Sequence, residues 1–272
     1  MTGGGDQIAF SGSIPERYDR YLGDTLFDPY ALDLAARLPR SARRLLELAC
    51  GTGIATRRLM EAMPGGATLT ATDLSEAMVD YARAHLAAHP PLELRTADCA
   101  ALPFGAASFD AAICQFGVMF VPDKALAFRE ARRVLVPGGT FLFNVWDSLR
   151  FNPATRIAQE VIAALHPADP PRFYDIPFGF SNAETIRGLL DDAGFTDLSI
   201  EFVSKRSRSP SAHDYAMGLV AGTPMATGIQ DRGSLSLERV IEAVGAAIAA
   251  EYGAGAIDAP MRALVVSARA AP

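Results

Sequence analysis

The 272-residue sequence has little of what marks metal-binding, secreted or membrane-spanning proteins. It carries only three cysteines and four histidines. The cysteines have no metal-ligand spacing. His85 and His89, four residues apart on a predicted helix, have a spacing that can bind a metal, but no third ligand is evident and a solvated helix face is favoured. No apolar run approaches the roughly 18 residues needed to cross a bilayer, and the first residues lack the basic and apolar regions of a signal peptide. We therefore expect a cytoplasmic protein with reduced thiols, no metal site and no membrane span.

Positive charge is also scarce. The chain has 25 Lys and Arg against 31 Asp and Glu, which gives a net charge of −6. Nucleic-acid binding requires clustered Lys and Arg to neutralise phosphates, and the one short basic run, residues 205–208, is typical of a solvated strand end. The composition therefore argues against a nucleic-acid partner. Half of the residues are hydrophobic, which is enough for a large α/β core.

The stretch Glu47–Leu59 predicts a strand, a glycine turn and a helix. An apolar run over 43–48 is typical of a buried strand, Gly51 and Gly53 interrupt it, and apolar residues return at helical spacing over 54–63. Such a turn lets the backbone approach a ligand and directs the free amides of the helix N-terminus toward it. Many α/β proteins use glycine there only for packing, so the turn alone is a weak signal.

Asp73 strengthens the case for a bound nucleoside. It follows the next predicted strand, residues 67–72, about 20 residues after the glycines, where a carboxylate can accept both hydroxyls of a ribose. Thr56 stands where a dinucleotide fingerprint has its third glycine. That substitution counts against a nicotinamide cofactor, although an NAD(P)-dependent oxidoreductase stays open as an alternative.

Four motifs follow one another in order. They read Glu-Leu-Ala-Cys-Gly-Thr-Gly at 47–53, Ala-Thr-Asp-Leu-Ser-Glu-Ala-Met at 71–78, Ala-Asp-Cys at 97–99 with Leu-Pro-Phe at 102–104 and Ser-Phe-Asp at 108–110, and Val-Pro-Gly-Gly-Thr at 136–140. Together they resemble the motifs of class I S-adenosylmethionine-dependent methyltransferases, in the small-molecule subgroup similar to the quinone-biosynthesis C-methyltransferases. The resemblance covers about residues 43–146.

The resemblance implies that the chain binds S-adenosyl-L-methionine and releases S-adenosyl-L-homocysteine. Glu47 would face the methionine amino group through hydrogen bonds or water, and Gly51 and Gly53 would line the methionine moiety. The candidate cofactor-binding residues are Tyr18, Tyr21, Glu47, Ala49, Gly51, Thr52, Gly53, Asp73, Leu74, Met78, Asp98, Cys99, Gln115 and Phe116.

The end of the third predicted strand, residues 92–97, would recognise the base. Asp98 can accept the adenine amino hydrogen while the Cys99 amide donates to a ring nitrogen; alternatively, Asp98 only caps a turn. Met78 has the helical spacing of a core residue, although the residues after the ribose-binding acid flank the adenine in the family it resembles.

Aromatic residues occur at both predicted edges of the site. Tyr18 and Tyr21 lie three residues apart on a predicted N-terminal helix, and they either pack as ordinary residues or close over the cofactor with their faces near the sulfonium. Gln115 and Phe116 lie at the carboxyl end of the fourth predicted strand, 109–118, where ligands bind in open α/β sheets. This end lacks the Asn/Asp-Pro-Pro-Tyr/Phe of enzymes that methylate bases or glutamine amides, so we expect a small-molecule methyl acceptor.

The alternation of strands and helices predicts an α/β fold, a Rossmann-like doubly wound sheet of seven strands, mostly parallel with the last antiparallel. We expect an N-terminal helical cap over 1–36, a cofactor-binding core over 37–150, and a part over 151–272 that completes the sheet. This last part would carry substrate-lid insertions at about 151–180 and 209–255, the second with two helices.

The expected reaction is an in-line methyl transfer. A methyl sulfonium is already electrophilic, so the protein needs chiefly to align it with the acceptor. His166, His213 and Tyr174 are candidates for a general base, but each has a structural or surface alternative, and no catalytic residue is assigned. A homodimer is possible, and a domain that binds the cofactor without methylating anything would carry the same motifs. An aromatic-lined cavity would favour the enzyme.

Overall fold

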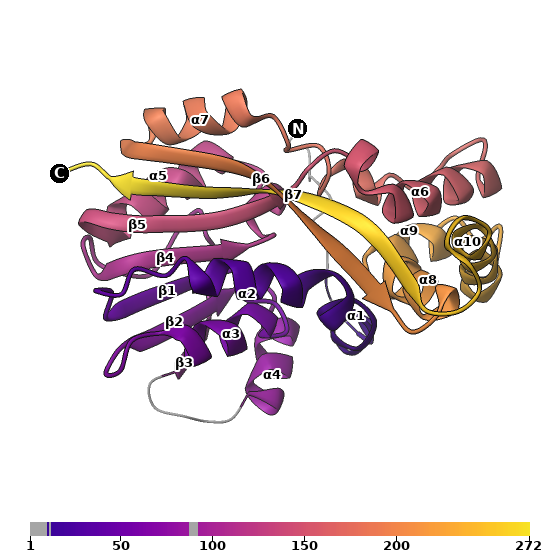
Figure 1. The fold of residues 1–272 in the computed structure, drawn as a ribbon, viewed down its shortest axis with the longest axis horizontal. Coiled ribbons are helices and arrows are strands. Elements are labelled where there is room, and N and C mark those ends of the chain that lie inside the picture. The colour runs from indigo at the N-terminus through magenta and orange to yellow at the C-terminus, as the bar shows by residue number, and fades with distance from the viewer. Residues whose placement is uncertain (1–9, 11, 87–91) are drawn as a thin grey trace.

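A computed structural model describes residues 10, 12–86 and 92–272, which form a seven-stranded sheet of order β3-β2-β1-β4-β5-β7-β6 (Figure 1). The strands are β1 (Arg44–Leu48), β2 (Thr68–Asp73), β3 (Leu92–Thr96), β4 (Phe109–Gln115), β5 (Leu135–Trp146), β6 (Phe195–Ser209) and β7 (Ile257–Ala270). Strands β1 to β5 are parallel, and β7 runs antiparallel to both β5 and β6. The predicted fold class is therefore confirmed.

Most helices connect the strands, and the helices over residues 153–165 and 212–252 form a separate group beyond the sheet, called the cap below. They are α1 (Ile14–Leu22), α2 (Asp28–Ala36), α3 (Ile54–Ala62), α4 (Glu76–His85), α5 (Lys124–Val134), α6 (Pro153–Leu165), α7 (Ala183–Asp192), α8 (Ala212–Ala221), α9 (Met225–Gln230) and α10 (Leu237–Tyr252). Short turns of helix are the π-helical η1 (Gly23–Phe27) and the 3₁₀ segments η2 (Val118–Phe120), η3 (Leu149–Phe151) and η4 (Phe173–Asp175). Within the described ranges, no helix is long and apolar enough to cross a membrane.

The central strands are apolar on both sides because helices cover both faces of the sheet. Along β4, Ala111 and Ile113 join a core with residues of α2 and α3, whereas Ala112 and Cys114 join the larger core that includes α5. Figure 1 shows α2 and α3 in front of the sheet and α5 behind it. This double cover places the carboxyl ends of the parallel strands at one open edge.

The cap lies beyond that edge. Strands β6 and β7 continue past the sheet as a two-stranded ribbon and lead to α8, α9 and α10, beside which α6 lies (Figure 1). The ribbon explains why these strands are 15 and 14 residues long, whereas the sequence predicted only residues 198–203 and 261–268. They pair with each other from Phe195–Ala270 to Ser209–Ile257, with one register shift between Thr196 and Ser199.

Several local predictions were wrong. The insertion between β6 and β7 contains three helices instead of two, and α2 is preceded by the π-helical η1. The Pro-Gly-Gly stretch at 137–139, which in sequence predicts a turn after a helix, lies within β5, where the register against β4 shifts and Gly138 has φ +74°. The Ser-Asn-Ala-Glu sequence at 181–184 predicts a capping box that opens at its serine, but α7 is capped by Asn182, whose side chain accepts from the Thr185 amide at 2.9 Å. The sequence also predicts a helix over 76–89, and its expected end lies outside the described residues.

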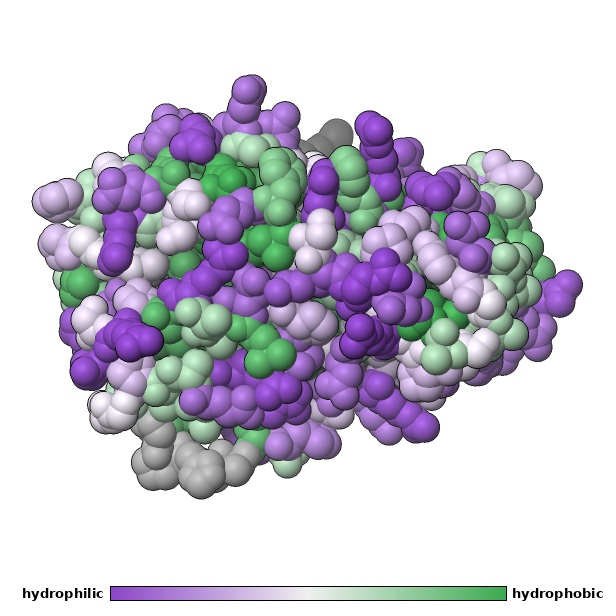
Figure 2. All heavy atoms as spheres, viewed as in Figure 1, coloured by the Kyte–Doolittle hydropathy of each residue, from purple (hydrophilic) through white to green (hydrophobic). Residues whose placement is uncertain are grey.

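The basic run at 205–208 is paired on the surface. Lys205 contacts Asp33 of α2 at 3.0 Å, and Arg206 and Arg208 both contact Asp258 of β7, at 2.6 and 3.8 Å. Figure 2 shows polar side chains distributed over this face of the molecule with hydrophobic ones between them. The run therefore belongs to a solvated strand end, as predicted.

Gly117 allows the chain after β4 to approach the chain after β1. A Cβ on Gly117 would lie 2.4 Å from the Ala49 Cβ and 2.7 Å from the Cys114 Sγ. Ala49 itself has φ +53°, so its backbone already occupies an uncommon conformation. The site at this edge therefore depends on a glycine that the motifs do not include.

We expect Gly117→Ala to destabilise the protein by about 1–3 kcal/mol, because the added methyl group overlaps two packed atoms. Gly188→Ala is the matched control. Gly188 lies in α7 with nothing within 4 Å of an added Cβ, so alanine there should be neutral or stabilise by up to about 1 kcal/mol. Urea unfolding measures both, and equal effects of the two variants would contradict the close approach.

Candidate active site

The turn between β1 and α3 has an unusual backbone. Ala49, Gly51 and Gly53 all have positive φ, at 53°, 55° and 91°. A Cβ on Gly51 would meet nothing within 4 Å, so its backbone angle is what requires glycine there, whereas one on Gly53 would lie 2.7 Å from Leu86 Cδ1. Gly53 caps α3, and the first amides of that helix face the open edge. The sequence predicted this turn correctly.

Asp73 lies directly beside the turn. At the end of β2, its Oδ2 accepts from the Gly51 amide and its Oδ1 from the Ser75 amide, each at 2.8 Å. Burial raises the pKa of this carboxyl, and the backbone amides oppose the rise. The two ends of the predicted nucleoside site are therefore joined by a hydrogen bond, and the carboxylate is held in one orientation.

Glu47 is fully buried in β1. Neither carboxylate oxygen has a hydrogen-bond partner among the described residues, and the same holds for the Thr56 hydroxyl. Burial raises the pKa of Glu47 to about 8; the nearby Thr56 side chain lowers it, and the charge of Asp73 raises it further. An unpaired buried carboxylate is costly, so this position is suited to a ligand that brings a positive charge.

The base-recognition candidates differ in exposure. Asp98 is exposed, and its Oδ1 accepts from the Ala100 amide at 2.8 Å, so it does cap a turn. Cys99 is buried, and burial raises the pKa of its thiol to about 12. Met78 is a core residue at 3% exposure, whereas Leu74 is 54% exposed and presents an apolar surface next to Asp73. Adenine recognition by these residues stays a prediction.

The two tyrosines of α1 point to different places. Tyr18 lines the cavity described below and stacks on Phe27 with the ring centroids 4.6 Å apart. Burial raises its pKa, with further contributions from Asp73 and Asp19. Tyr21 instead packs beside α8, where a Cβ added to Gly218 would lie 3.1 Å from the Tyr21 Cβ. Of the two tyrosines, only Tyr18 therefore lines the cavity, and the charge of Asp73 acts on it.

Asp19 fastens α1 to the glycine turn, and the sequence did not single it out. Its Oδ1 accepts from the Thr52 hydroxyl at 3.0 Å and its Oδ2 from the Tyr81 hydroxyl at 3.3 Å. Thr52 thus serves as a link between the turn and the N-terminal helix. No sequence signal marks Asp19, because its partners lie 33 and 62 residues away.

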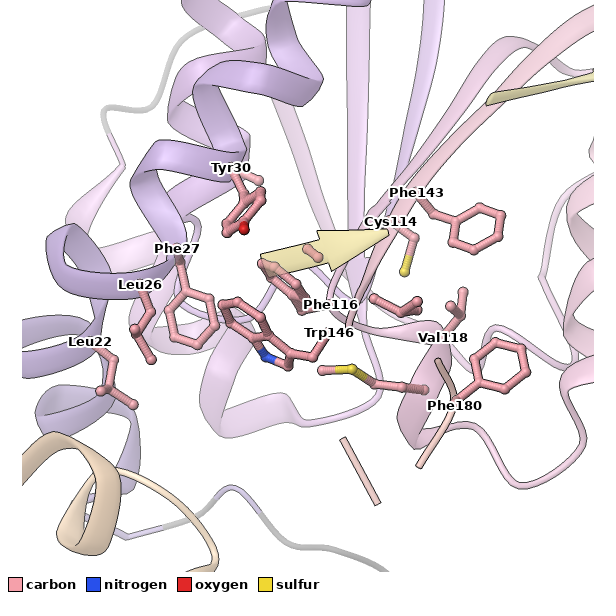
Figure 3. Close-up of a cluster of buried hydrophobic side chains, with 14 of the residues drawn as sticks. Leu22, Leu26, Phe27, Tyr30, Cys114, Phe116, Val118, Phe143, Trp146 and Phe180 are labelled. Atoms are coloured by element: carbon pink, nitrogen blue, oxygen red, sulfur yellow. The ribbon is translucent and has the colours of Figure 1, made fainter. Parts of the chain in front are cut away.

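Gln115 and Phe116 end β4 at the open edge. The Gln115 side chain donates to the Phe27 carbonyl at 3.3 Å, and its Oε1 is buried without a partner among the described residues. Phe116 has φ +51°, which ends the strand earlier than predicted, and its amide donates to Asn144 Oδ1 at 2.9 Å. Figure 3 shows Phe116, Trp146 and Phe27 gathered below Tyr30.

A cavity lies between this edge and the cap. Its volume is about 60 Å³, several times the roughly 10–15 Å³ that one water molecule requires. Among the described residues that line it, none carries a charge. They are Phe10, Tyr18, Leu22, Leu26, Phe27, Phe116, Met119, Phe120, Trp146, Asn152, Ala154, Thr155, Phe173, Tyr174, Pro177, Phe178, Tyr215, Leu219, Thr223, Pro260 and Met261.

The three candidates for a general base do not supply one in this cavity. His166 ends α6 with its Nδ1 3.0 Å from the Ile162 carbonyl oxygen, and it is not a lining residue. His213 is exposed on α8. Tyr174 does line the cavity, but its hydroxyl donates to the Leu219 carbonyl at 2.8 Å, and burial raises its pKa.

Comparison with known proteins gives the chain a family context. A family described as "Methyltransferase domain" matches residues 46–143. The ubiquinone/menaquinone biosynthesis C-methyltransferase UbiE of Acidiphilium cryptum is 32% identical over 186 residues, which cover 61% of this chain and 71% of that protein. The demethylmenaquinone methyltransferase of Staphylococcus epidermidis is 28% identical over 203 residues, covering 69% and 84%.

A solved structure is similar over most of the fold. The Haemonchus contortus phosphoethanolamine N-methyltransferase 2, in complex with S-adenosyl-L-methionine, superposes with a TM-score of 0.59 at 16% identity. The match covers 95% of this chain and 57% of that one. At this identity the similarity supports the fold alone.

Glu47 should make stability depend on pH. Below its ordinary pKa of 4.5 the carboxyl is neutral in both states. As pH rises it ionises first in the unfolded chain, so the free energy of unfolding falls until about pH 8, where the folded carboxyl ionises too. Glu47→Gln removes this loss. The stability of the variant relative to the wild type should therefore grow between about pH 5 and pH 8, by about 1.4 kcal/mol for each pH unit.

Urea unfolding of the ligand-free protein at about pH 5, 6.5 and 8 measures this difference. A gap between variant and wild type that stays constant over this range would show that Glu47 has an ordinary pKa.

Proposed function

The chain belongs to the S-adenosylmethionine-dependent methyltransferases, the family of the ubiquinone/menaquinone C-methyltransferases, and we propose that it methylates a small, uncharged, apolar or aromatic acceptor. The observation that carries the proposal is the lining of the cavity, in which the described residues include many aromatic side chains and no charged one. A charged acceptor would lose its hydration there without gaining a partner of opposite charge. The names of the two relatives given above refer to quinones, which are uncharged rings, and this agrees with the proposal.

The proposed cofactor site uses the turn and the two carboxylates. Asp73 accepts the ribose hydroxyls, since its position is already fixed by two amides. Glu47 holds the ammonium of the methionine moiety, because its buried oxygens otherwise lack partners within the described chain. Gly51 and Gly53 let the backbone approach that moiety, and Asp98 with Cys99 contacts the adenine. The bound cofactor supplies an electrophilic methyl group.

The protein contributes alignment more than acid–base chemistry. Tyr18 and Phe116 lie where the cofactor side meets the cavity, so their faces can surround a sulfonium while the cavity holds the acceptor. Because no His, Asp or Glu is among the described lining residues, the acceptor atom must be nucleophilic without help from a cavity base. A neutral amine meets that condition as it enters, and a phenol or an acidic carbon meets it once its proton has passed to water.

The two segments 151–180 and 209–255 form the proposed substrate lid. Support comes from the cavity, since Thr155, Phe178 and Leu219 all line it. An oxidoreductase and a non-catalytic binding module are less well supported, because membership of a methyltransferase family accounts for the missing third glycine and the cavity leaves room for an acceptor.

Asp73→Ala should weaken binding of S-adenosylhomocysteine about hundredfold, because two hydrogen bonds to a charged group are lost. Calorimetric titration measures the affinity, with NADH run beside it. Asp110→Ala is the matched control: Asp110 pairs with Arg44 at the opposite end of β4, so its removal should leave the affinity unchanged. Binding of NADH in place of the homocysteine compound would overturn the proposed cofactor.

The charge of the acceptor is tested with three analogues of one ring. We expect 4-ethylphenol to bind the protein loaded with S-adenosylhomocysteine at least about tenfold more tightly than tyramine or 3-(4-hydroxyphenyl)propanoate, whose chains carry a positive or a negative charge. Calorimetry or NMR titration measures the three affinities. Tighter binding of either charged analogue would contradict an uncharged acceptor.

A further inference from the structure

Trp146 is the only tryptophan of the chain and ends β5 with aromatic neighbours around its ring. Phe116 stacks on it at a centroid distance of 4.0 Å and 14° between planes, and Phe178 lies nearly parallel at 5.9 Å. Tyr30 meets it edge to face at 5.6 Å. Figure 3 shows the indole nitrogen on the edge of the ring that faces away from Tyr30. With phenylalanines stacked on the ring, this edge is the part that a ligand can contact.

Most other polar groups around the cavity are already paired. The hydroxyls of Tyr174 and Thr223 both donate to the Leu219 carbonyl at 2.8 Å. The Tyr215 hydroxyl donates to Ser207 at 2.8 Å. Asn152 uses its side-chain amide on backbone groups of Asp147, Ser148 and Arg262. These groups stabilise the cap, and a ligand could bind them only if their present hydrogen bonds were broken.

Three lining groups make no hydrogen bond within the described ranges: the hydroxyls of Tyr18 and Thr155 and the indole N–H of Trp146. A hydroxyl can donate or accept, so it distinguishes poorly between ligand groups. An indole N–H only donates. Trp146 is 5% exposed, and the N–H of a buried tryptophan usually finds a partner. Its free donor therefore selects for a ligand atom that accepts.

We infer that Trp146 determines the specificity for the methyl acceptor: its indole N–H donates a hydrogen bond to a carbonyl, ether or phenolic oxygen on the acceptor ring. The inference rests on the proposed function, which places the acceptor in this cavity. A ring without such an oxygen displaces water from the N–H and leaves it without a partner, and it binds less well for that reason.

A chain with one tryptophan gives one indole N–H resonance, so the wild-type protein tests the inference directly. Acetophenone and ethylbenzene differ by a carbonyl in place of a methylene. Added to ¹⁵N-tryptophan-labelled protein loaded with S-adenosylhomocysteine, acetophenone should move the indole proton downfield, whereas ethylbenzene should not. Equal shifts from both probes, or no binding by either, would overturn the inference.

Trp146→Phe removes the donor and keeps an aromatic ring. It should lower the affinity for acetophenone about tenfold and leave that for ethylbenzene within about twofold, as expected for one lost hydrogen bond. Phe178→Leu is the matched control, since it reduces ring contact but leaves the donor in place, and it should weaken both probes by the same factor. Parallel weakening of both probes by Trp146→Phe would show that Trp146 contributes only packing.

Binding of S-adenosylhomocysteine is measured for each protein in the same series. If the wild type binds S-adenosylhomocysteine but acetophenone and ethylbenzene have the same effect on the indole resonance, this inference alone fails. If the wild type does not bind it, the proposed function fails first. The resonance experiment uses the wild-type protein, so it tests the inference even if Trp146→Phe folds poorly.

Discussion

Two carboxylates, the buried Glu47 and the half-buried Asp73, lie beside one glycine turn, and the rest of the site depends on how their charge is accommodated. Asp73 is stabilised by the Gly51 and Ser75 amides, and Gly51 donates from a left-handed backbone conformation. Glu47 has no such partner in the described chain, so burial and repulsion from Asp73 raise its pKa. A group that lowers the stability of the free protein is typical of a binding site, because the ligand provides the partner that the fold does not.

The site divides sharply by polarity. The cofactor side contains the two carboxylates and the amides of the turn, whereas the described lining of the cavity contains no charge. Tyr18 belongs to both sides, since Asp73 contributes to its pKa and its ring stacks on Phe27 at the cavity. Under the proposed function, a cationic methyl donor would be favoured on one side and a neutral acceptor on the other. That arrangement suits a displacement in which positive charge leaves the sulfur.

The sequence was informative where a function is encoded within a few consecutive residues. The turn at 49–53, the acid at the end of β2 and the strand–helix alternation all follow from local patterns, and the structure agrees with them. Asp19, Gly117 and Trp146 were not identified. Each acts through contacts with residues distant along the chain, such as Asp19 with Thr52 or Gly117 with Ala49, and no periodicity or motif records such contacts. The long β6–β7 ribbon was missed for the same reason, because pairing beyond the sheet depends on the partner strand.

The family match includes only a small part of the cavity lining, so it says little about the acceptor. The family match covers residues 46–143, and of the described lining residues only Phe116, Met119 and Phe120 fall within it. The remaining lining residues are Phe10, residues of α1 and η1, Trp146 and residues of the segments after it, where the family match does not extend. Under the proposed function, the core would supply the shared chemistry of methyl transfer, and the residues outside the match would select the acceptor. Because Trp146 ends β5, the sheet fixes its position, and Phe178 from the segment after β5 lies nearly parallel to its ring.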